Sequence, residues 1–188
     1  MKDNSRSPEN LFERRREAKP PYTRNARHFD QVRVDVAQGR GLGVFATAPV
    51  KARFAIGRVL GEIKPKDYRS DYCVEFGDGA LEPFAPYRFL NHSCDPNCEF
   101  IEWTIDVPLF NNDSSSDEPS RELWLHAIRD VKEGEELTVD YGWEWRSAIP
   151  CLCGSPNCRG WICRVEDLEE LRRHVSDDGS ISETPVRP

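Results

Sequence analysis

The sequence lacks any long apolar run, and no stretch approaches the roughly 20 residues that a membrane-spanning helix needs. The first residues are polar and basic without an apolar segment, so we expect no secretory signal. Basic residues are also outnumbered, because the chain has 26 Lys and Arg residues and 33 Asp and Glu residues, for a net charge of -7. This balance disfavours direct, specific nucleic-acid binding and fits basic partners such as lysine-rich peptides.

The chain contains seven cysteines among its 188 residues, and four of them lie between positions 151 and 163. An odd, clustered set fits reduced thiols and metal binding better than a secreted disulfide scaffold. We therefore expect an intracellular protein with a cysteine-bound metal ion.

Composition divides the chain into four parts. Residues 1–27 are rich in arginine and lack an apolar period, which predicts a basic, flexible N-terminal arm. Residues 28–146 contain many short β-like runs separated by Gly and Pro turns. Residues 147–164 hold the cysteine cluster, and residues 165–188 hold a helical pattern followed by a polar tail.

Short strands dominate the predicted secondary structure. Val32, Val34 and Val36 alternate with charged residues, the period of a half-buried strand. Residues 165–175 alone show helical spacing of apolar positions. Further strands are expected at residues 44–46, 54–63, 71–76, 103–110, 123–128 and 137–141, with a loop at 111–120. The sequence therefore predicts a mainly β fold with one short C-terminal helix.

The spacing of Cys151, Cys153 and Cys158 favours a zinc site. A tight turn containing glycine and proline lets the three thiolates converge on one ion, and tetrahedral ligation leaves one position open. The sequence offers three candidates for the fourth ligand: Cys94, Cys98 and Cys163.

A second motif, Asn-His-Ser-Cys-Asp-Pro-Asn, occupies residues 91–97. His92 and Cys94 could form a nucleophilic pair, but side chains two positions apart on an extended chain are poorly placed for a proton relay. The polar side chains of this motif could equally fix the backbone in a tight turn.

Two further motifs stand near glycines. Glu-Glu-Leu-Thr-Val-Asp-Tyr at residues 135–141 ends on Tyr141, which by itself is most simply an aromatic core residue. Gly-Arg-Gly-Leu-Gly at residues 39–43 lacks the Gly-x-Gly-x-x-Gly spacing of dinucleotide sites and precedes a strand. Its glycines favour the close approach of a ligand to bare backbone.

Taken in order, the four motifs resemble the SET-domain lysine methyltransferases with a post-SET zinc segment, over about residues 30–163. The resemblance implies a SET-domain fold of several small β-sheets, with a knot-like crossing of the Asn-His and Asp-Tyr segments. It implies methyl transfer from S-adenosyl-L-methionine to the amine of a lysine in a protein, with a histone tail as one candidate substrate. The alternative is a catalytically silent SET fold that acts as a peptide-binding module.

The resemblance also implies roles for individual residues. Tyr141 matches the catalytic tyrosine of the family. One structural zinc ion is expected on Cys94, Cys151, Cys153 and Cys158. The cofactor-binding positions are Arg40, Gly41, Leu42, Tyr72, Arg88, Asn91, His92 and Trp161.

Partners and compartment follow from the implied substrate. A histone substrate predicts a nuclear, chromatin-associated protein, and another protein substrate predicts the cytoplasm. No membrane association is expected. No cysteine precedes Cys73, so the cysteine-rich pre-SET cluster of some relatives is missing.

Overall fold

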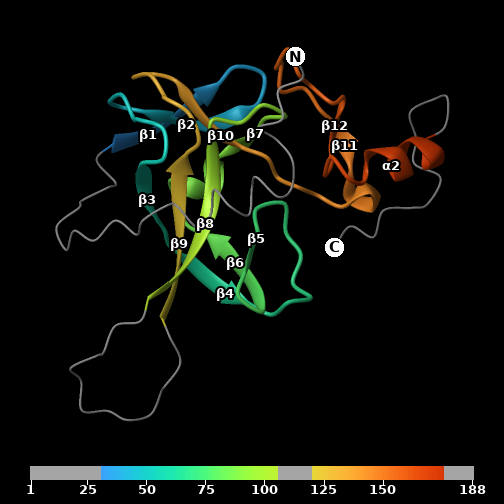
Figure 1. The fold of residues 1–188 in the computed structure, drawn as a ribbon, viewed down its shortest axis with the longest axis horizontal. Coiled ribbons are helices and arrows are strands. Elements are labelled where there is room, and N and C mark those ends of the chain that lie inside the picture. The colour runs from blue at the N-terminus through green and yellow to red at the C-terminus, as the bar shows by residue number, and fades with distance from the viewer. Residues whose placement is uncertain (1–30, 106–119, 176–188) are drawn as a thin grey trace, which may run out of the picture.

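The computed structural model describes residues 31–105 and 120–175 (Figure 1). The basic arm expected at residues 1–27 lies outside the described residues. The same holds for nearly all of the loop expected at 111–120 and for the end of the C-terminal tail.

The described chain consists mostly of short strands, as the sequence predicted, and α2 is its one α-helix. No helix in these residues is long and apolar enough to cross a bilayer. The elements, in chain order, are β1 (Val32–Ala37), β2 (Gly41–Ala46), β3 (Ala55–Val59), β4 (Gly61–Lys64), β5 (Val74–Phe76), β6 (Gly79–Pro83), η2 (Tyr87–Phe89), β7 (Asn91–His92), β8 (Cys98–Ile105), β9 (Ser120–Ala127), β10 (Glu136–Val139), η3 (Trp145–Ser147), β11 (Ile149–Pro150), β12 (Trp161–Ile162) and α2 (Leu168–His174).

These strands form small separate sheets (Figure 1). One has the order β1-β2-β10-β7, two have three strands (β3-β9-β8 and β4-β6-β5), and β11 pairs with β12. β7 and β10 run parallel, with Asn91 opposite Thr138 and His92 opposite Val139. This pairing sets the Asn-His segment beside the segment that leads to Tyr141, the juxtaposition that the resemblance implied.

The main hydrophobic core lies where several of these sheets meet. Val44 of β2, Ile56 of β3 and Leu125 of β9 are completely buried, as is Leu137 of β10. Each comes from a different strand, so no single sheet provides the core. Burial of these side chains fixes β10, and therefore the start of the Tyr141 segment, against the rest of the domain.

Several strands differ from the sequence expectation in their boundaries, and one strand was not predicted. β5 begins at Val74 rather than at residue 71, and β8 begins at Cys98 rather than at residue 103. β6 (Gly79–Pro83) was missed because glycine, glutamate and proline have low β propensity. Pairing with β4 on one side and β5 on the other stabilises this strand despite its sequence.

β1 confirms the predicted strand but not the burial of its valines. Val36 is 72% exposed and Val34 is 37% exposed, while Ala37 is buried. β1 stands at the edge of its sheet, so its period of two reflects the pleat of the strand and not a buried face.

The C-terminal elements β11, β12 and α2 lie together at one side of the molecule (Figure 1). α2 directs the fully buried Leu171 against Trp145 and Cys163, and His174 stacks on Trp145 with ring centroids 4.4 Å apart. The helix predicted at 165–175 is thus confirmed in a shorter form that packs on its own chain. Val165 precedes it and is 63% exposed.

Candidate active site and metal centre

Asn91 joins three parts of the chain that are distant in sequence. Its amide Nδ2 donates a hydrogen bond to the Leu42 carbonyl at 2.9 Å and another to Oε1 of Glu136 at 2.8 Å. Arg40 forms an ion pair with the other oxygen of the same carboxylate. We call this group of four residues the Asn91 cradle. It brings together three predicted cofactor-binding residues through Glu136, which the sequence analysis did not single out.

The glycines beside this cradle have specific physical reasons to be glycine. Gly41 adopts a φ of +76°, a left-handed conformation that is strained for other residues. A Cβ on Gly43 would lie 2.7 Å from Oε1 of Glu136 and 3.2 Å from Nδ2 of Asn91. The β2 backbone therefore approaches the Glu136 carboxylate too closely for a side chain at position 43 unless that carboxylate moves, and the Asn91 amide is also in tight contact.

Tyr141 follows the end of β10 and is held at both its backbone and its hydroxyl. The hydroxyl donates to the Leu90 carbonyl at 2.8 Å, and the backbone N–H donates to Nδ1 of His92 at 3.2 Å. Burial raises the pKa of Tyr141 to about 12. The side chain is therefore a neutral phenol at pH 7 and cannot serve as a general base.

Aromatic rings surround this phenol. The Tyr141 ring centroid is 5.3 Å from that of His92 and 5.3 Å from that of Trp143. Tyr72 is close enough to contribute to the raised pKa of Tyr141. The guanidinium of Arg88 lies 4.2 Å from the centroid of the Tyr72 ring. Tyr72 and Arg88, two predicted site residues, thus form a stacked pair near the tyrosine.

His92 uses both ring nitrogens within the protein. Because the Tyr141 backbone N–H can only donate, Nδ1 of His92 accepts and Nε2 carries the proton. Nε2 lies 3.3 Å from Sγ of Cys94. Burial lowers the pKa of His92 to about 4, so the ring is neutral at pH 7. A ligand at this segment would meet the backbone of His92 and not its imidazole.

The expectation that His92 and Cys94 are poorly placed for a proton relay did not anticipate that their side chains meet. It assumed an extended chain, but β7 is only two residues long and the chain turns directly after it. The contact does not make a nucleophilic pair, because Cys94 belongs to a cluster of four thiols.

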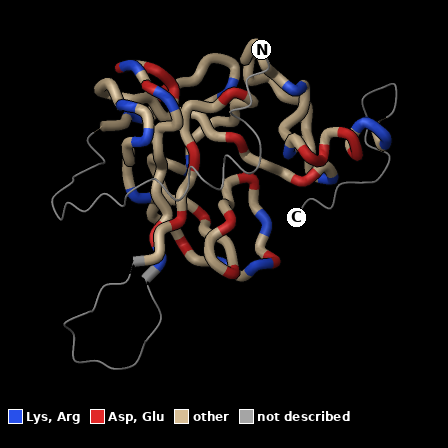
Figure 2. The backbone as a smooth tube through the Cα atoms, in the orientation of Figure 1, with Lys and Arg blue, Asp and Glu red and all other residues tan. Residues whose placement is uncertain are grey.

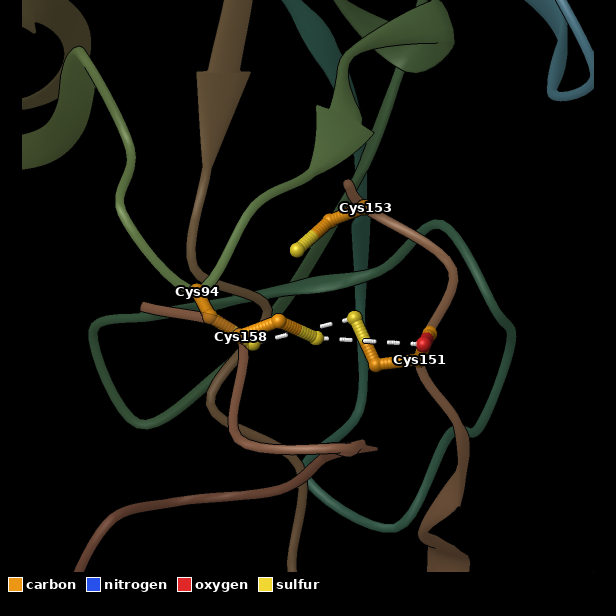
Figure 3. Close-up of side chains that lie close together, drawn as sticks. All are labelled: Cys94, Cys151, Cys153 and Cys158. Atoms are coloured by element: carbon orange, nitrogen blue, oxygen red, sulfur yellow. Dashed lines mark hydrogen bonds between the residues drawn. The ribbon is translucent and has the colours of Figure 1, made fainter. Parts of the chain in front are cut away.

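Cys94, Cys151, Cys153 and Cys158 point toward one shared space (Figure 3). Their sulfur atoms all lie within 4.8 Å of one another, and those of Cys94 and Cys151 are 3.7 Å apart. A tetrahedral ion with Zn–S bonds of about 2.3 Å sets its sulfurs about 3.8 Å apart. The four-cysteine cluster therefore fits a structural zinc ion.

The ionisation of these thiols also fits a cation. Burial raises the pKa of Cys151 and of Cys94. The pKa of Cys153 is instead lowered to about 6. Burial alone would raise it, but hydrogen bonds from the backbone and from neighbouring thiols outweigh the effect of burial. Without a positive ion, four adjacent thiolates cannot coexist, and a bound divalent metal removes this conflict.

The two other candidates for the fourth ligand lie elsewhere. Cys98 is buried in the main core, and Cys163 is buried beside Leu171 in the C-terminal cluster. Trp161, a predicted cofactor-binding residue, lies in β12 with its carbonyl 3.9 Å from Sγ of Cys94. Its described contacts are with residues 147–164, which we call the metal segment, and with the cluster around Leu171, rather than with the Asn91 cradle.

The metal segment is tied to the Tyr141 segment by an ion pair. Arg159, which follows the ligand Cys158, donates two hydrogen bonds to the carboxylate of Asp140. A second tie joins Asn157 to Asp95 at 3.2 Å. The sequence analysis missed this arrangement, because nothing in the spacing of Asp140 and Arg159 indicates a pair.

Three features define a SET-type site with a post-SET zinc segment: a glycine loop against an asparagine amide, a partly buried tyrosine and a cluster of four thiols. The chain belongs to the SET domain family, which matches residues 41–142. The matched residues contain the Asn91 cradle and Tyr141, and three of the four clustered cysteines follow them.

Curated relatives agree with this assignment. The chain is 46% identical over 153 residues to the histone-lysine N-methyltransferase, H3 lysine-4 specific, of Schizosaccharomyces pombe, covering 72% of this chain and 15% of that protein. It is 30% identical over 163 residues to the histone-lysine N-methyltransferase ash1 of Drosophila melanogaster, covering 74% of this chain and 7% of that protein. The chain thus spans less than a fifth of the length of these relatives.

The fold is shared with solved structures. The crystal structure of KRYPTONITE in complex with mCHG DNA and SAH matches with a TM-score of 0.56 and 23% identity, over 70% of this chain and 28% of that chain. This similarity shows that the arrangement of small sheets is that of a SET fold.

Proposed function

We propose that this chain transfers a methyl group from S-adenosyl-L-methionine to the side-chain amine of lysine in a protein substrate. The observation that carries the proposal is the position of Tyr141, a partly buried neutral phenol fixed next to the Asn91 cradle in a SET fold. The names of the similar curated proteins, both histone-lysine N-methyltransferases, support the same chemistry.

The substrate amine must first lose a proton. Lysine has an ordinary pKa of about 10.4 and is almost fully protonated at pH 7, so it cannot attack. The rings of Tyr72, Tyr141 and Trp143 would desolvate the amine, which lowers its pKa and favours the neutral nucleophile. This proposal requires no base from Tyr141, consistent with its raised pKa.

The site then has to align the reacting groups. When bound, S-adenosyl-L-methionine supplies a methyl group activated by a sulfonium. The Tyr141 hydroxyl donates a hydrogen bond to the Leu90 carbonyl, which leaves the lone pairs of its oxygen free to accept weak C–H···O contacts from the methyl group. Positioning of this kind can lower a barrier by several kcal/mol without a protein nucleophile.

Residues from several segments would hold the cofactor. The backbone of Gly41 and Leu42, the Asn91 side chain and the His92 backbone would form one wall. The charged and aromatic groups proposed around it are Arg40, Tyr72, Arg88 and Trp161. Arg40 is already paired with Glu136, so the cradle is ordered before a ligand arrives.

Zinc, when bound, supplies a structural crosslink between Cys94 and the segment at residues 147–164. We propose that this segment is a post-SET unit that closes over a SET domain at residues 28–146. The ligand Cys94 lies only three residues after Asn91, so the ion would hold the C-terminal segment beside the cofactor site.

A histone H3 tail is the proposed substrate, which places the protein at nuclear chromatin. The net charge of -7 suits a basic tail. Lys and Arg residues are interspersed with Asp and Glu residues through the described chain (Figure 2). Because nucleic-acid binding normally uses a surface of clustered basic residues, we expect no direct, specific nucleic-acid contact.

The test is to incubate the zinc-loaded chain with S-adenosyl-L-methionine and recombinant histone H3 and to measure methylation by mass spectrometry. We expect methylation by the unmodified chain and a loss of about 100-fold or more in Tyr141→Phe, which lacks the hydroxyl. Equilibrium dialysis should show that Tyr141→Phe still binds the cofactor. Cofactor binding without methylation of any tested protein would contradict the activity, and absence of cofactor binding would favour the peptide-binding module.

A further inference from the structure

Arg159 and Asp140 form a two-point contact between the metal segment and the end of β10. Nη1 of Arg159 lies 2.7 Å from Oδ2 of Asp140, and Nη2 lies 2.9 Å from Oδ1. The Arg159 side chain is only 12% exposed. Arg159 directly follows the metal ligand Cys158, and Asp140 directly precedes Tyr141. The pair therefore links the metal segment to the turn that carries Tyr141.

Asp140 organises that turn. Its Oδ1 also accepts the backbone N–H of Gly142 at 3.2 Å and lies 3.5 Å from Nδ1 of His92. The same His92 nitrogen accepts the backbone N–H of Tyr141. Because Nδ1 of His92 already accepts this N–H, it makes no hydrogen bond with Asp140. The carboxylate that Arg159 holds in place therefore acts on the Tyr141 turn through the N–H of Gly142, the next residue.

Stability alone explains this pair poorly. Nε of Arg159 is buried without a hydrogen-bond partner among the described residues. The Asp140 side chain is 31% exposed, and ion pairs that reach solvent typically add at most about 1 kcal/mol. The metal segment is also attached by the hydrogen bond from Asn157 to Asp95. In addition, this segment carries three of the four thiol ligands. What distinguishes the Arg159 contact is that it reaches the Tyr141 turn.

We propose that Arg159 is a positioning residue for methyl transfer, an inference that rests on the proposed function. The planar guanidinium of Arg159 orients the Asp140 carboxylate when the metal segment is in place. Through Asp140, it holds Tyr141 in the geometry for methyl transfer. Lysine would keep the charge but cannot make two parallel hydrogen bonds to one carboxylate. The identity of the residue as arginine, and not its charge alone, is therefore required.

The first experiment compares kinetics of the zinc-loaded chain with recombinant histone H3 as substrate. We expect Arg159→Lys and Arg159→Met to lower kcat about tenfold or more, with the KM for S-adenosyl-L-methionine and the zinc content within about twofold of the unmodified chain. Asn157→Ala removes the hydrogen bond to Asp95 that also attaches the metal segment and should leave kcat unchanged. An unchanged kcat in both Arg159 variants, or a loss that only follows zinc content, would overturn the proposal.

The second experiment does not depend on activity. Hydrogen exchange of the Tyr141 amide should accelerate about tenfold in Arg159→Met, while the amide of the core residue Ile56 stays protected. If the unmodified chain transfers no methyl group, the proposed function fails, and the exchange rate still decides whether Arg159 orders the Tyr141 turn. Equal Tyr141 exchange in the variant and the unmodified chain would overturn the proposal.

Discussion

The SET domain and the metal segment are held together by different forces. In the SET domain, Ile56 and Leu125 are fully buried among apolar side chains from several strands. In the metal segment, Leu152 stands between two thiol ligands and is 82% exposed. Burial of apolar side chains from many strands thus dominates one region, while the other combines a small cluster around Cys163 with thiol ligands and a few ion pairs.

The site lies where these two regions meet. Tyr141 and Asn91 belong to the SET domain, but Cys94 lies close behind Asn91 and Asp140 directly precedes Tyr141. The metal segment contacts both of these neighbours, through the thiol cluster and through Arg159. A region with little core of its own can therefore complete a site whose framework is built by the other.

The strongest way to separate the two regions is to remove the metal ligands. Cys151→Ser combined with Cys153→Ser should abolish the binding of one zinc ion per chain, because structural zinc in small sites contributes about 10 kcal/mol or more. Residues 147–164 should then lose hydrogen-exchange protection, while β3 and β9 keep theirs. Metal analysis and exchange on the same sample measure both effects. A full zinc complement in the double variant would contradict the assignment of these thiols.

The reverse perturbation weakens the SET core and leaves the metal cluster alone. Leu125→Ala should lower the free energy of unfolding by about 2–5 kcal/mol, because it leaves a cavity in a fully buried position. Leu152→Ala is the matched control and should change it by less than about 0.5 kcal/mol. Urea denaturation measures both variants, and equal destabilisation would remove the contrast between the two regions.

A smaller change tests the cradle within the SET domain. Gly43→Ala places a methyl group against Glu136 and Asn91, so it should weaken cofactor affinity about tenfold through displacement of the Asn91 amide. Equilibrium dialysis measures the affinity, and zinc content should be unchanged. Unaltered affinity would indicate that this close approach does not shape the cofactor site.

A further prediction concerns how the stability of the SET domain depends on pH. Trp103 donates to Nε2 of the buried His126, and burial lowers the pKa of His126 to about 4. The unfolded state, with a pKa of about 6.5, binds more protons between these values, so stability falls as pH is lowered from 6.5 to 4, by up to about 1.4 kcal/mol per pH unit. Thermal unfolding should show a shallower slope in His126→Phe. Loss of the metal ion at low pH affects the unmodified chain and the His126→Phe variant alike. Equal slopes of stability against pH in the two proteins would contradict this role of His126.

The sequence predicted the class of fold better than its details. Alternating valines correctly predicted β1, yet the exposure of Val36 shows that a strand period need not mark a buried face. β6 escaped prediction because its stability comes from two neighbouring strands and not from its own residues. Tertiary pairing of this kind leaves no local pattern.

The residues of the candidate site likewise divide into those that the sequence motifs predicted and those that only the fold revealed. Motif order pointed to Asn91, Tyr141 and the four cysteines, and the structure brings each set together. Glu136 and Arg159 were missed, since each acts through a partner distant in sequence that only the folded chain brings close. The motifs therefore identified the groups for chemistry, but not the residues that orient them.

The most direct test is a crystal structure of the zinc-loaded chain with S-adenosylhomocysteine, the product left by the methyl donor. We expect the amino-acid end of this molecule at the Asn91 side chain and the Leu42 backbone, its nucleoside near Trp161, and its sulfur facing the Tyr141 hydroxyl. A nucleoside bound away from both the Asn91 cradle and the metal segment would contradict a methyl-transfer site between them.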